Sequence, residues 1–177
     1  MKNIYKEYEK AAKMISKEDT VIINRIGDAV LICNSYYLVK VHTALYDTCF
    51  RPVSFRFPAL DDGDKMTSNG KKRMPEPCTC DLNRCIPDYD MLFEVAATNF
   101  IEDLQEGRLV RVFLDPDSRI ISVNNDYYTA LRCFNPYRDA WYGGLKKPLV
   151  SPDFRDEDNA VMILPVNTRE RYFSVRG

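Results

Sequence analysis

Three cysteines lie within eight residues of one another, in the stretch Cys78–Cys85 (Cys-Thr-Cys-Asp-Leu-Asn-Arg-Cys). Thiolates are ligands that zinc prefers, and Asp81, Cys49 or His42 would supply a fourth. Structural zinc sites usually use paired Cys-x-x-Cys units, and Cys-x-Cys with a third cysteine five residues on departs from that spacing. Free thiols in an irregular loop are therefore the favoured interpretation. Zinc bound by three thiols stays open as the alternative, and its ligands would be Cys78, Cys80 and Cys85.

Residues that could catalyse a reaction are sparse. His42 is the only histidine, and we find no nucleophile motif in the sequence that would use it as a base. Trp141-Tyr142-Gly143-Gly144-Leu145 does not have the spacing of a phosphate-binding loop. Asp61-Asp62-Gly63-Asp64 lacks the spaced ligands and the final Glu of a calcium loop. The sequence therefore predicts a protein that is not an enzyme and needs no cofactor.

Residues 2–17 predict a helix with two different faces. At ~100° per residue, one sector collects the apolar side chains of Ile4, Tyr5, Tyr8, Ala11, Ala12 and Ile15. The opposite sector, about 80° wide, collects Lys2, Lys6, Lys10, Lys13 and Lys17. A lysine face is commonly just a solvated surface. Because Glu7 and Glu9 lie off the stripe, a helix that faces phosphates is the alternative.

The elements that follow predict one sheet with an irregular excursion. Strands are expected at Thr20–Ile26, Ala29–Cys33 and Tyr36–His42, and Gly27-Asp28 forms a hairpin turn between the first two. Val53–Phe57 alternates like a further strand. Residues 58–87 contain prolines and turn residues, which predict a long loop that is either mobile or functional.

The second half of the chain is expected to start with a helix from Asp88 to Glu106 that Gly107 ends. Its buried side would hold Met91, Leu92, Val95, Ala96, Phe100, Ile101 and Leu104. Then come strands at Arg108–Leu114 and Arg119–Val123, a short helix at Asp126–Phe134 capped by Asn124 or Asn125, and strands at Pro148–Val150, Ala160–Val166 and Arg171–Val175. This order predicts an α+β domain.

Composition sets the class of protein. The 177 residues suit a single domain, and 45% hydrophobic with 29% charged residues is typical of a globular chain. We find no transmembrane stretch and no signal peptide, so we expect a cytoplasmic protein with no membrane partner. Since 25 Lys and Arg balance 26 Asp and Glu, binding to nucleic acid would need local clusters of charge.

Three segments near the C-terminus resemble a known family. Ile121–Leu131 (Ile-Ser-Val-Asn-Asn-Asp-Tyr-Tyr-Thr-Ala-Leu) is similar to a strand-to-helix segment of bacterial DNA sliding clamps, the processivity clamps of the DNA polymerase III beta subunit type. Lys147-Pro148-Leu149-Val150 and Ala160–Val166 resemble two later strands of these domains. The resemblance implies a clamp-like fold over residues 1–177, in which antiparallel sheets pack on two helices. Residues 58–107 would then be an insertion containing a loop and a helix.

The resemblance also implies where partners would bind. Basic residues on the inner helices would contact DNA phosphates without reading bases, a role for the lysine stripe and for Arg132. A groove for a partner peptide would be built from Met162, Leu164, Pro165 and Val166. Asn167 departs from the Arg that is common in the family. A ring needs several such domains, so encircling DNA would require self-association.

Three functions remain open at this point. The first is a clamp-like DNA-binding module without catalysis, such as a phage or mobile-element replication accessory, whose partner would be double-stranded DNA of any sequence. The second is a protein-interaction module of the same fold that does not bind DNA. The third is a zinc-stabilised regulator.

Overall fold

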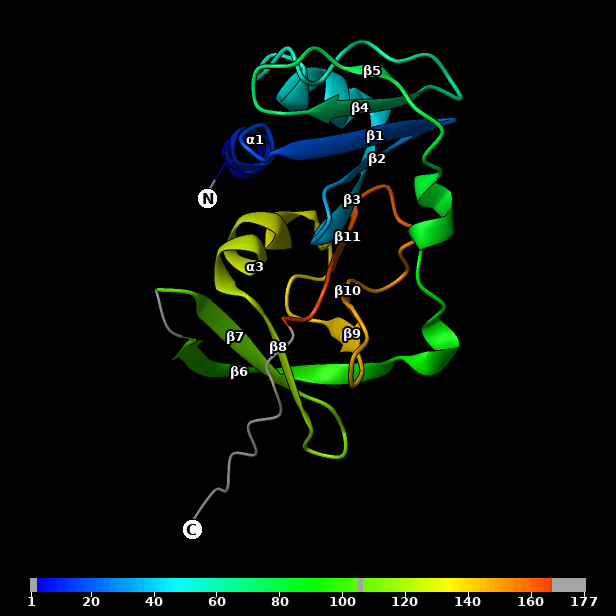
Figure 1. Cartoon of the computed structure of the whole chain (residues 1–177). Helices are drawn as coiled ribbons and strands as arrows, with labels where there is room; N and C mark the ends of the chain where they lie inside the picture. Colours follow the sequence, from blue (N-terminus) through cyan, green and yellow to red (C-terminus); the bar gives the residue numbers. More distant parts are fainter. Residues whose placement is uncertain (1–2, 105–106, 167–177) are drawn as a thin grey trace.

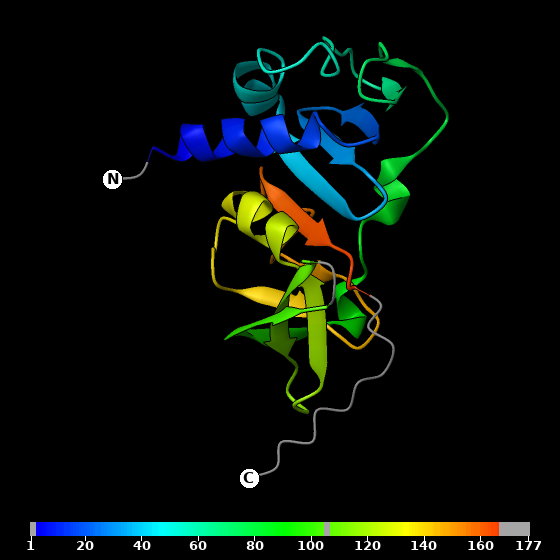
Figure 2. The same cartoon turned by 60° about the vertical axis from the view of Figure 1, so that its left-hand side comes forward.

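The computed structural model describes residues 3–104 and 107–166. Over these residues the chain mixes short helices with antiparallel strands, as the α+β prediction requires. Strands that are neighbours in the order β5-β4-β1-β2-β3-β11-β10-β9-β6-β7-β8 are hydrogen-bonded, so the sheet is continuous from end to end (Figure 1). Helices α1 and α3 lie on the same side of this sheet (Figures 1 and 2). No helix within the described ranges is long and apolar enough to cross a membrane.

The elements occur in the following order along the chain. The first half holds α1 (Ile4–Ile15), β1 (Thr20–Ile26), β2 (Ala29–Cys33), β3 (Tyr37–His42), α2 (Thr43–Leu45), the π-helical turn η1 (Tyr46–Phe50), β4 (Lys65–Asn69) and β5 (Glu76–Pro77). The second half holds the 3-10 turns η2 (Leu82–Cys85) and η3 (Tyr89–Met91), then β6 (Phe93–Asp103), β7 (Leu109–Leu114), β8 (Ile120–Asn124), α3 (Asn125–Leu131), the 3-10 turn η4 (Arg132–Phe134), β9 (Trp141–Gly143), β10 (Leu149–Val150) and β11 (Ala160–Ile163).

The N-terminal half forms largely as predicted because its signals are local. The Asn3 side chain accepts a hydrogen bond from the Tyr5 N–H at 3.1 Å and so caps α1. The apolar face of α1 buries Ala11, Ala12 and Ile15 completely. Strands β1, β2 and β3 form the expected meander, and Gly27 has the positive φ of 58° that its turn requires.

The C-terminal half keeps the predicted hairpin of β7 and β8 and the helix α3. Asn124 caps α3 by accepting from the N–H groups of Asp126 at 2.8 Å and Tyr127 at 3.1 Å. Strands β10 and β11 also form, although β11 ends at Ile163. The strand predicted at Arg171–Val175 lies outside the described residues. Strand β9, at Trp141–Gly143, was not predicted from the sequence.

The helix predicted from Asp88 to Glu106 is wrong, because Phe93–Asp103 is the strand β6. This strand pairs with β7 along most of its length and with β9 through Phe93–Val95. Of the expected buried face, only Leu92 and Val95 are buried, whereas Phe100 is 75% exposed. Pairing with two neighbours therefore overrides a helical spacing of apolar residues. Residues 58–107, expected to be an insertion, contribute β4, β5 and β6 to the sheet.

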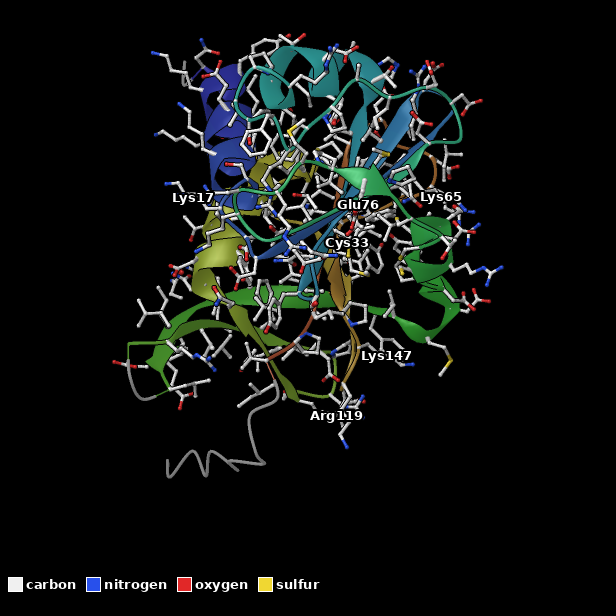
Figure 3. The ribbon with its side chains drawn as sticks, turned by 45° about the horizontal axis from the view of Figure 1, so that its top comes forward. Lys17, Cys33, Lys65, Glu76, Arg119 and Lys147 are labelled. Atoms are coloured by element: carbon white, nitrogen blue, oxygen red, sulfur yellow. The ribbon has the colours of Figure 1, made fainter. Side chains whose placement is uncertain are left out.

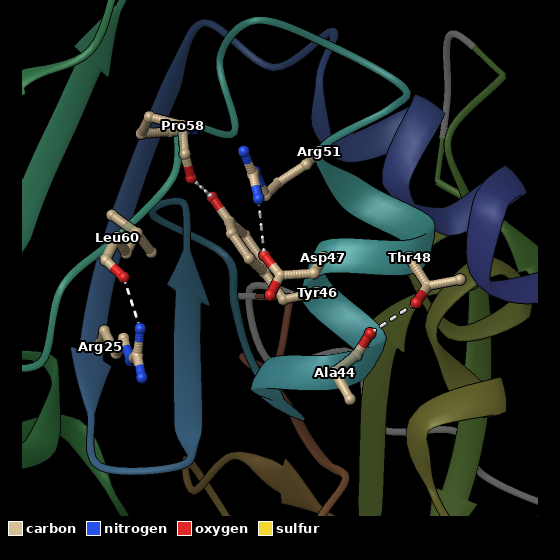
Figure 4. Close-up of polar contacts among 8 residues, drawn as sticks. All are labelled: Arg25, Ala44, Tyr46, Asp47, Thr48, Arg51, Pro58 and Leu60. Atoms are coloured by element: carbon tan, nitrogen blue, oxygen red, sulfur yellow. Dashed lines mark hydrogen bonds and ion pairs between the residues drawn. The ribbon is translucent and has the colours of Figure 1, made fainter.

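The strand predicted at Val53–Phe57 is also wrong, because this segment consists of turns that follow α2 and η1. Side-chain contacts hold the region together (Figure 4). The Tyr46 hydroxyl donates to the carbonyl oxygen of Pro58 at 2.9 Å, and Arg25 donates to the carbonyl oxygen of Leu60 at 2.5 Å. The prediction also missed β4, whose polar residues become a strand by pairing with β1.

The sheet separates two cores. The larger one lies under the helices and includes Ala11, Ile15, Val39, Phe134 and Trp141. The smaller one, on the opposite face, includes Leu31, Leu38, Leu82, Phe154 and Met162. Each face of the central strands is therefore covered, one by α1, η1 and α3, the other by η2, η3 and the 151–159 loop.

Candidate functional site

The lysines of α1 form an exposed row on the face of the helix turned away from the sheet. Lys6, Lys10, Lys13 and Lys17 are all exposed. Lys17 lies just beyond the end of the helix, at the side of the molecule away from Cys33 and Lys147 (Figure 3). None of these four lysines forms an ion pair with a described residue. Lys2, the fifth member of the predicted stripe, is outside the described residues.

Aromatic packing fixes α1 against its neighbours. The Tyr8 ring stacks on the Phe134 ring of η4, with centroids 5.2 Å apart and planes 22° apart. Helix α1 also packs against η1 on its other flank. These contacts hold α1 against its neighbours, and its lysines lie on the exposed face of the helix.

A buried guanidinium holds the C-terminal end of α1. Arg56 is fully buried and donates to the carbonyl oxygens of Ser16, Glu18 and Asp19, which follow the last turn of α1. It also donates to Ser68 of β4, at 2.8 Å to both the hydroxyl and the carbonyl oxygen. Burial lowers the pKa of Arg56. No pattern in the sequence indicates this role, because the alternation over Val53–Phe57 predicts a strand.

Arg132, the sixth predicted DNA contact, is exposed at the start of η4. Turn η4 packs beside α1, so Arg132 belongs to a neighbouring element on the same side of the sheet. Acidic groups are also present there: Glu9 is exposed and Glu7 half-buried on α1. Asp19 is paired with Lys71, with Nζ to Oδ1 at 3.9 Å.

A cavity of about 480 Å³ lies at the end of β11, on the side of the smaller core. Met162 and Leu164, two of the four predicted groove residues, line it with Leu92, Pro148 and Lys147. The other two do not line it. Pro165 bridges to Val123, and the Val166 N–H donates to the carbonyl oxygen of Ser122 at 2.8 Å, so both close the sheet onto β8.

The structure does not bring the predicted metal ligands together into a site. No three His, Cys, Asp or Glu side chains in the described residues lie close enough to hold an ion. Burial raises the pKa of the Cys33 thiol to about 12, and the neighbouring thiols of Cys85 and Cys80 add to the rise. His42, offered as a fourth ligand, instead caps α2, because its Nδ1 accepts from the Ala44 N–H at 3.1 Å.

Comparison with known proteins gives one weak likeness. No family model matches the sequence, and no curated protein matches it. Among solved structures, DNA polymerase III subunit beta from Borrelia burgdorferi, in complex with a natural product, is similar with a TM-score of 0.41 and 10% identity. The match covers 90% of this chain and 62% of that one, so the chain spans less than two thirds of its length. This is a weak resemblance of overall fold.

Proposed function

We propose that the chain is a non-catalytic binding module that contacts the phosphates of double-stranded DNA through α1. The observation that carries this proposal is the exposed row of Lys6, Lys10, Lys13 and Lys17 on α1, none of which forms an ion pair within the described residues. Lys6 and Lys13 are seven positions apart, or roughly 10 Å along the helix axis. Phosphates on duplex DNA supply a charge about every 1.7 Å, so such a row can contact several at once.

The contact would be independent of base sequence. Ammonium groups on flexible stems act as point charges that neutralise phosphates, and they carry no base readout unless they enter a groove. With four phosphates neutralised, the logarithm of the binding constant should fall against the logarithm of salt concentration with a slope of about −3.6. This salt dependence is the measurable signature of the proposal.

The test compares two triple charge reversals in the full chain. Lys6→Glu, Lys10→Glu and Lys13→Glu together should abolish binding to a random-sequence duplex, as measured by fluorescence anisotropy over a range of salt. Lys71→Glu, Lys72→Glu and Arg73→Glu change the net charge equally but lie in the exposed turn after β4, and they should leave most of the binding intact. Equal losses in both variants, or none in the first, would contradict a role for α1.

A second candidate function is supported by the cavity at the end of β11. Its apolar lining and the 61% exposed Met91 at its border suit the apolar side chains of a linear peptide. The test is selection from a random peptide library on the full chain, followed by binding to Leu164→Lys. Selected peptides should lose affinity for this variant and keep it for the α1 triple variant. A selection in which no peptide distinguishes Leu164→Lys from wild type would reject this function.

A further inference from the structure

A second cavity, of about 480 Å³, lies between the turns that follow η1 and the turn after β4. Phe55 and Met74 line it from these two sides, and their side chains are 51% and 70% exposed. Pro52, Phe57 and Pro58 add further apolar lining. Single exposed apolar side chains are ordinary, whereas several that gather around one hollow mark an interaction site. We call this hollow the Phe55–Met74 cavity.

The first wall of the Phe55–Met74 cavity rests on packed aromatic rings. The buried Phe57 ring meets the ring of Phe50 edge to face, with centroids 5.3 Å apart, and the ring of Tyr46 at 6.3 Å. The Tyr46 hydroxyl donates to the carbonyl oxygen of Pro58 at 2.9 Å (Figure 4). The turns that carry Phe55 are therefore held against the core.

A chain of hydrogen bonds joins the first wall to the second. Nε of the buried Arg56 donates to the Ser68 hydroxyl at 2.8 Å, and this hydroxyl donates to the carbonyl oxygen of Arg73 at 2.9 Å. The Arg73 N–H in turn donates to the carbonyl oxygen of Gly70 at 3.1 Å and closes the turn. The two walls are therefore positioned relative to each other before any ligand binds.

The turn that forms the second wall is basic. Lys71, Lys72 and Arg73 are all exposed and directly precede Met74. Lys71 pairs with Asp19 at 3.9 Å, an exposed contact that water weakens. Lys72 and Arg73 form no ion pair within residues 3–104 and 107–166. Two cations next to the cavity are therefore available to an acidic ligand.

Acidic groups around the Phe55–Met74 cavity do not cancel this charge. Asp47 lines the cavity, but it pairs with Arg51, which also lines it, at 3.2 Å (Figure 4). Glu76 is exposed two residues beyond Met74 and does not line the cavity. The chain as a whole has a net charge of −1, so the positive charge at this rim is a local feature.

We propose that the Phe55–Met74 cavity binds a peptide segment of a partner protein in which an apolar side chain is flanked by acidic residues. The apolar side chain enters between Phe55 and Met74, and the acidic residues face Lys72 and Arg73. Aromatic residues, Met and Arg are the types enriched at protein interfaces, and Met adapts its shape to different ligands. Complementary charge selects the partner and speeds its association. This binding function is additional to DNA binding by α1 and to the cavity at the end of β11.

The experiment selects peptides on the full chain from two random libraries, one with two fixed glutamates and one with two fixed lysines. We expect the glutamate library to give the tighter binders, with an apolar residue beside a glutamate. The selected peptides are then synthesised with a label, and their binding is measured by fluorescence anisotropy. Their affinity should fall as salt rises, because exposed charges make part of the contact.

Matched variants locate the binding site. Lys72→Glu with Arg73→Glu should weaken these peptides about tenfold or more, whereas Lys10→Glu with Lys13→Glu changes the charge equally and should leave them bound. Met74→Ala should also weaken them. Met91→Ala, at the border of the other cavity, replaces a methionine of similar exposure and should bind as wild type does. All these side chains are exposed, so the variants should fold normally.

The proposal is overturned if the glutamate library gives no binders, or if its binders do not distinguish Met74→Ala from Met91→Ala. Loss of duplex binding in Lys72→Glu with Arg73→Glu would assign the rim to DNA instead. A dimer in light scattering that Met74→Ala abolishes would make a second copy the occupant. Either result would overturn the acidic peptide. The outcome is separate from that for α1, because the two charge reversals lie on different elements.

Discussion

Arg56 carries a positive charge into the interior, and no carboxylate in the part of the chain that the structure describes forms an ion pair with it. Its guanidinium instead donates to the carbonyl oxygens of Ser16, Glu18 and Asp19 and to Ser68. Carbonyl groups at the C-terminal end of a helix carry a partial negative charge, so the end of α1 is a favourable place for a cation. The planar guanidinium satisfies several acceptors from two elements at once, which an ammonium group would not do.

Replacing Arg56 with methionine should therefore strongly reduce stability. Hydrogen bonds from a charged donor contribute about 1.5–3 kcal/mol each, and several are lost together. We expect the free energy of unfolding to fall by more than about 3 kcal/mol, measured by urea denaturation. Arg51→Met is the matched control, since its pair with Asp47 at 3.2 Å is exposed and should contribute only about 0–1 kcal/mol. Similar losses in the two variants would contradict this role for Arg56.

The carboxyl group of Asp115 predicts how the stability of the protein depends on pH. Although burial alone would raise its pKa, hydrogen bonds from Arg119 and from the Asp117 N–H lower it below the usual value. When the pKa of a carboxyl group is lower in the folded than in the unfolded state, its ionised form stabilises the folded protein. This stabilisation is fully present above the pKa of the unfolded state and is lost as pH falls through the pKa of the folded state. Asp115→Asn should therefore unfold at lower urea than wild type at pH 7, and the difference should shrink below about pH 4. A difference independent of pH would rule out the charge as its cause.

Residue-scale roles such as that of Arg56 escape sequence analysis for a physical reason. Arginine is rarely fully buried, and alternation places Phe55 and Phe57 inward. In the structure Phe57 is buried, but Phe55 is 51% exposed and Arg56 fully buried, because turns and not a strand set their directions. By contrast, the cap at Asn124 was predictable, since it depends only on the residues that follow it.

At the scale of elements, the β1–β2 hairpin depends on its turn. Gly27 has a φ of 58°, and a Cβ added there would meet nothing within 4 Å. Gly27→Ala should therefore cost only the backbone strain, about 1–2 kcal/mol in the free energy of unfolding, measured by urea denaturation. Gly27→Asn should cost less, because asparagine tolerates this conformation. A larger loss of unfolding free energy in Gly27→Asn than in Gly27→Ala would show that backbone strain does not determine the stability of this turn.

Strand β6 shows where element prediction fails. Its sequence contains alanines and apolar residues at helical spacing, which favoured a helix. What makes it a strand is pairing with β7 on one side and β9 on the other. The lysine row on α1, in contrast, follows from helical periodicity alone, so that candidate site was found from the sequence.

At the scale of the molecule, sites made from several segments were only partly predictable. The cavity combines β11 with the turn after β2, the 85–92 stretch and the turn before β10. Met162 and Leu164 were identified through a resemblance in one strand, but the other walls come from distant parts of the chain.

The two halves of the chain meet where β3 pairs with β11. Ile163 is fully buried in the larger core there, and the residues after β11 continue to β8 through the Val123–Pro165 bridge. Since one sheet and one core extend through this junction, we expect a single cooperative unit. Native-state hydrogen exchange should give similar opening free energies for the amides of β2 and of β7.

Ile163→Ala tests this cooperativity. Removing a fully buried side chain should lower the free energy of unfolding by about 2–5 kcal/mol. If the halves unfold together, the opening free energies of β2 and β7 amides should fall by the same amount. The exposed Leu164, one residue further on, offers a control: Leu164→Ala should change both values little. A loss confined to one of the two strands would show that the halves unfold separately, and that the β3–β11 junction joins their sheets without coupling their stabilities.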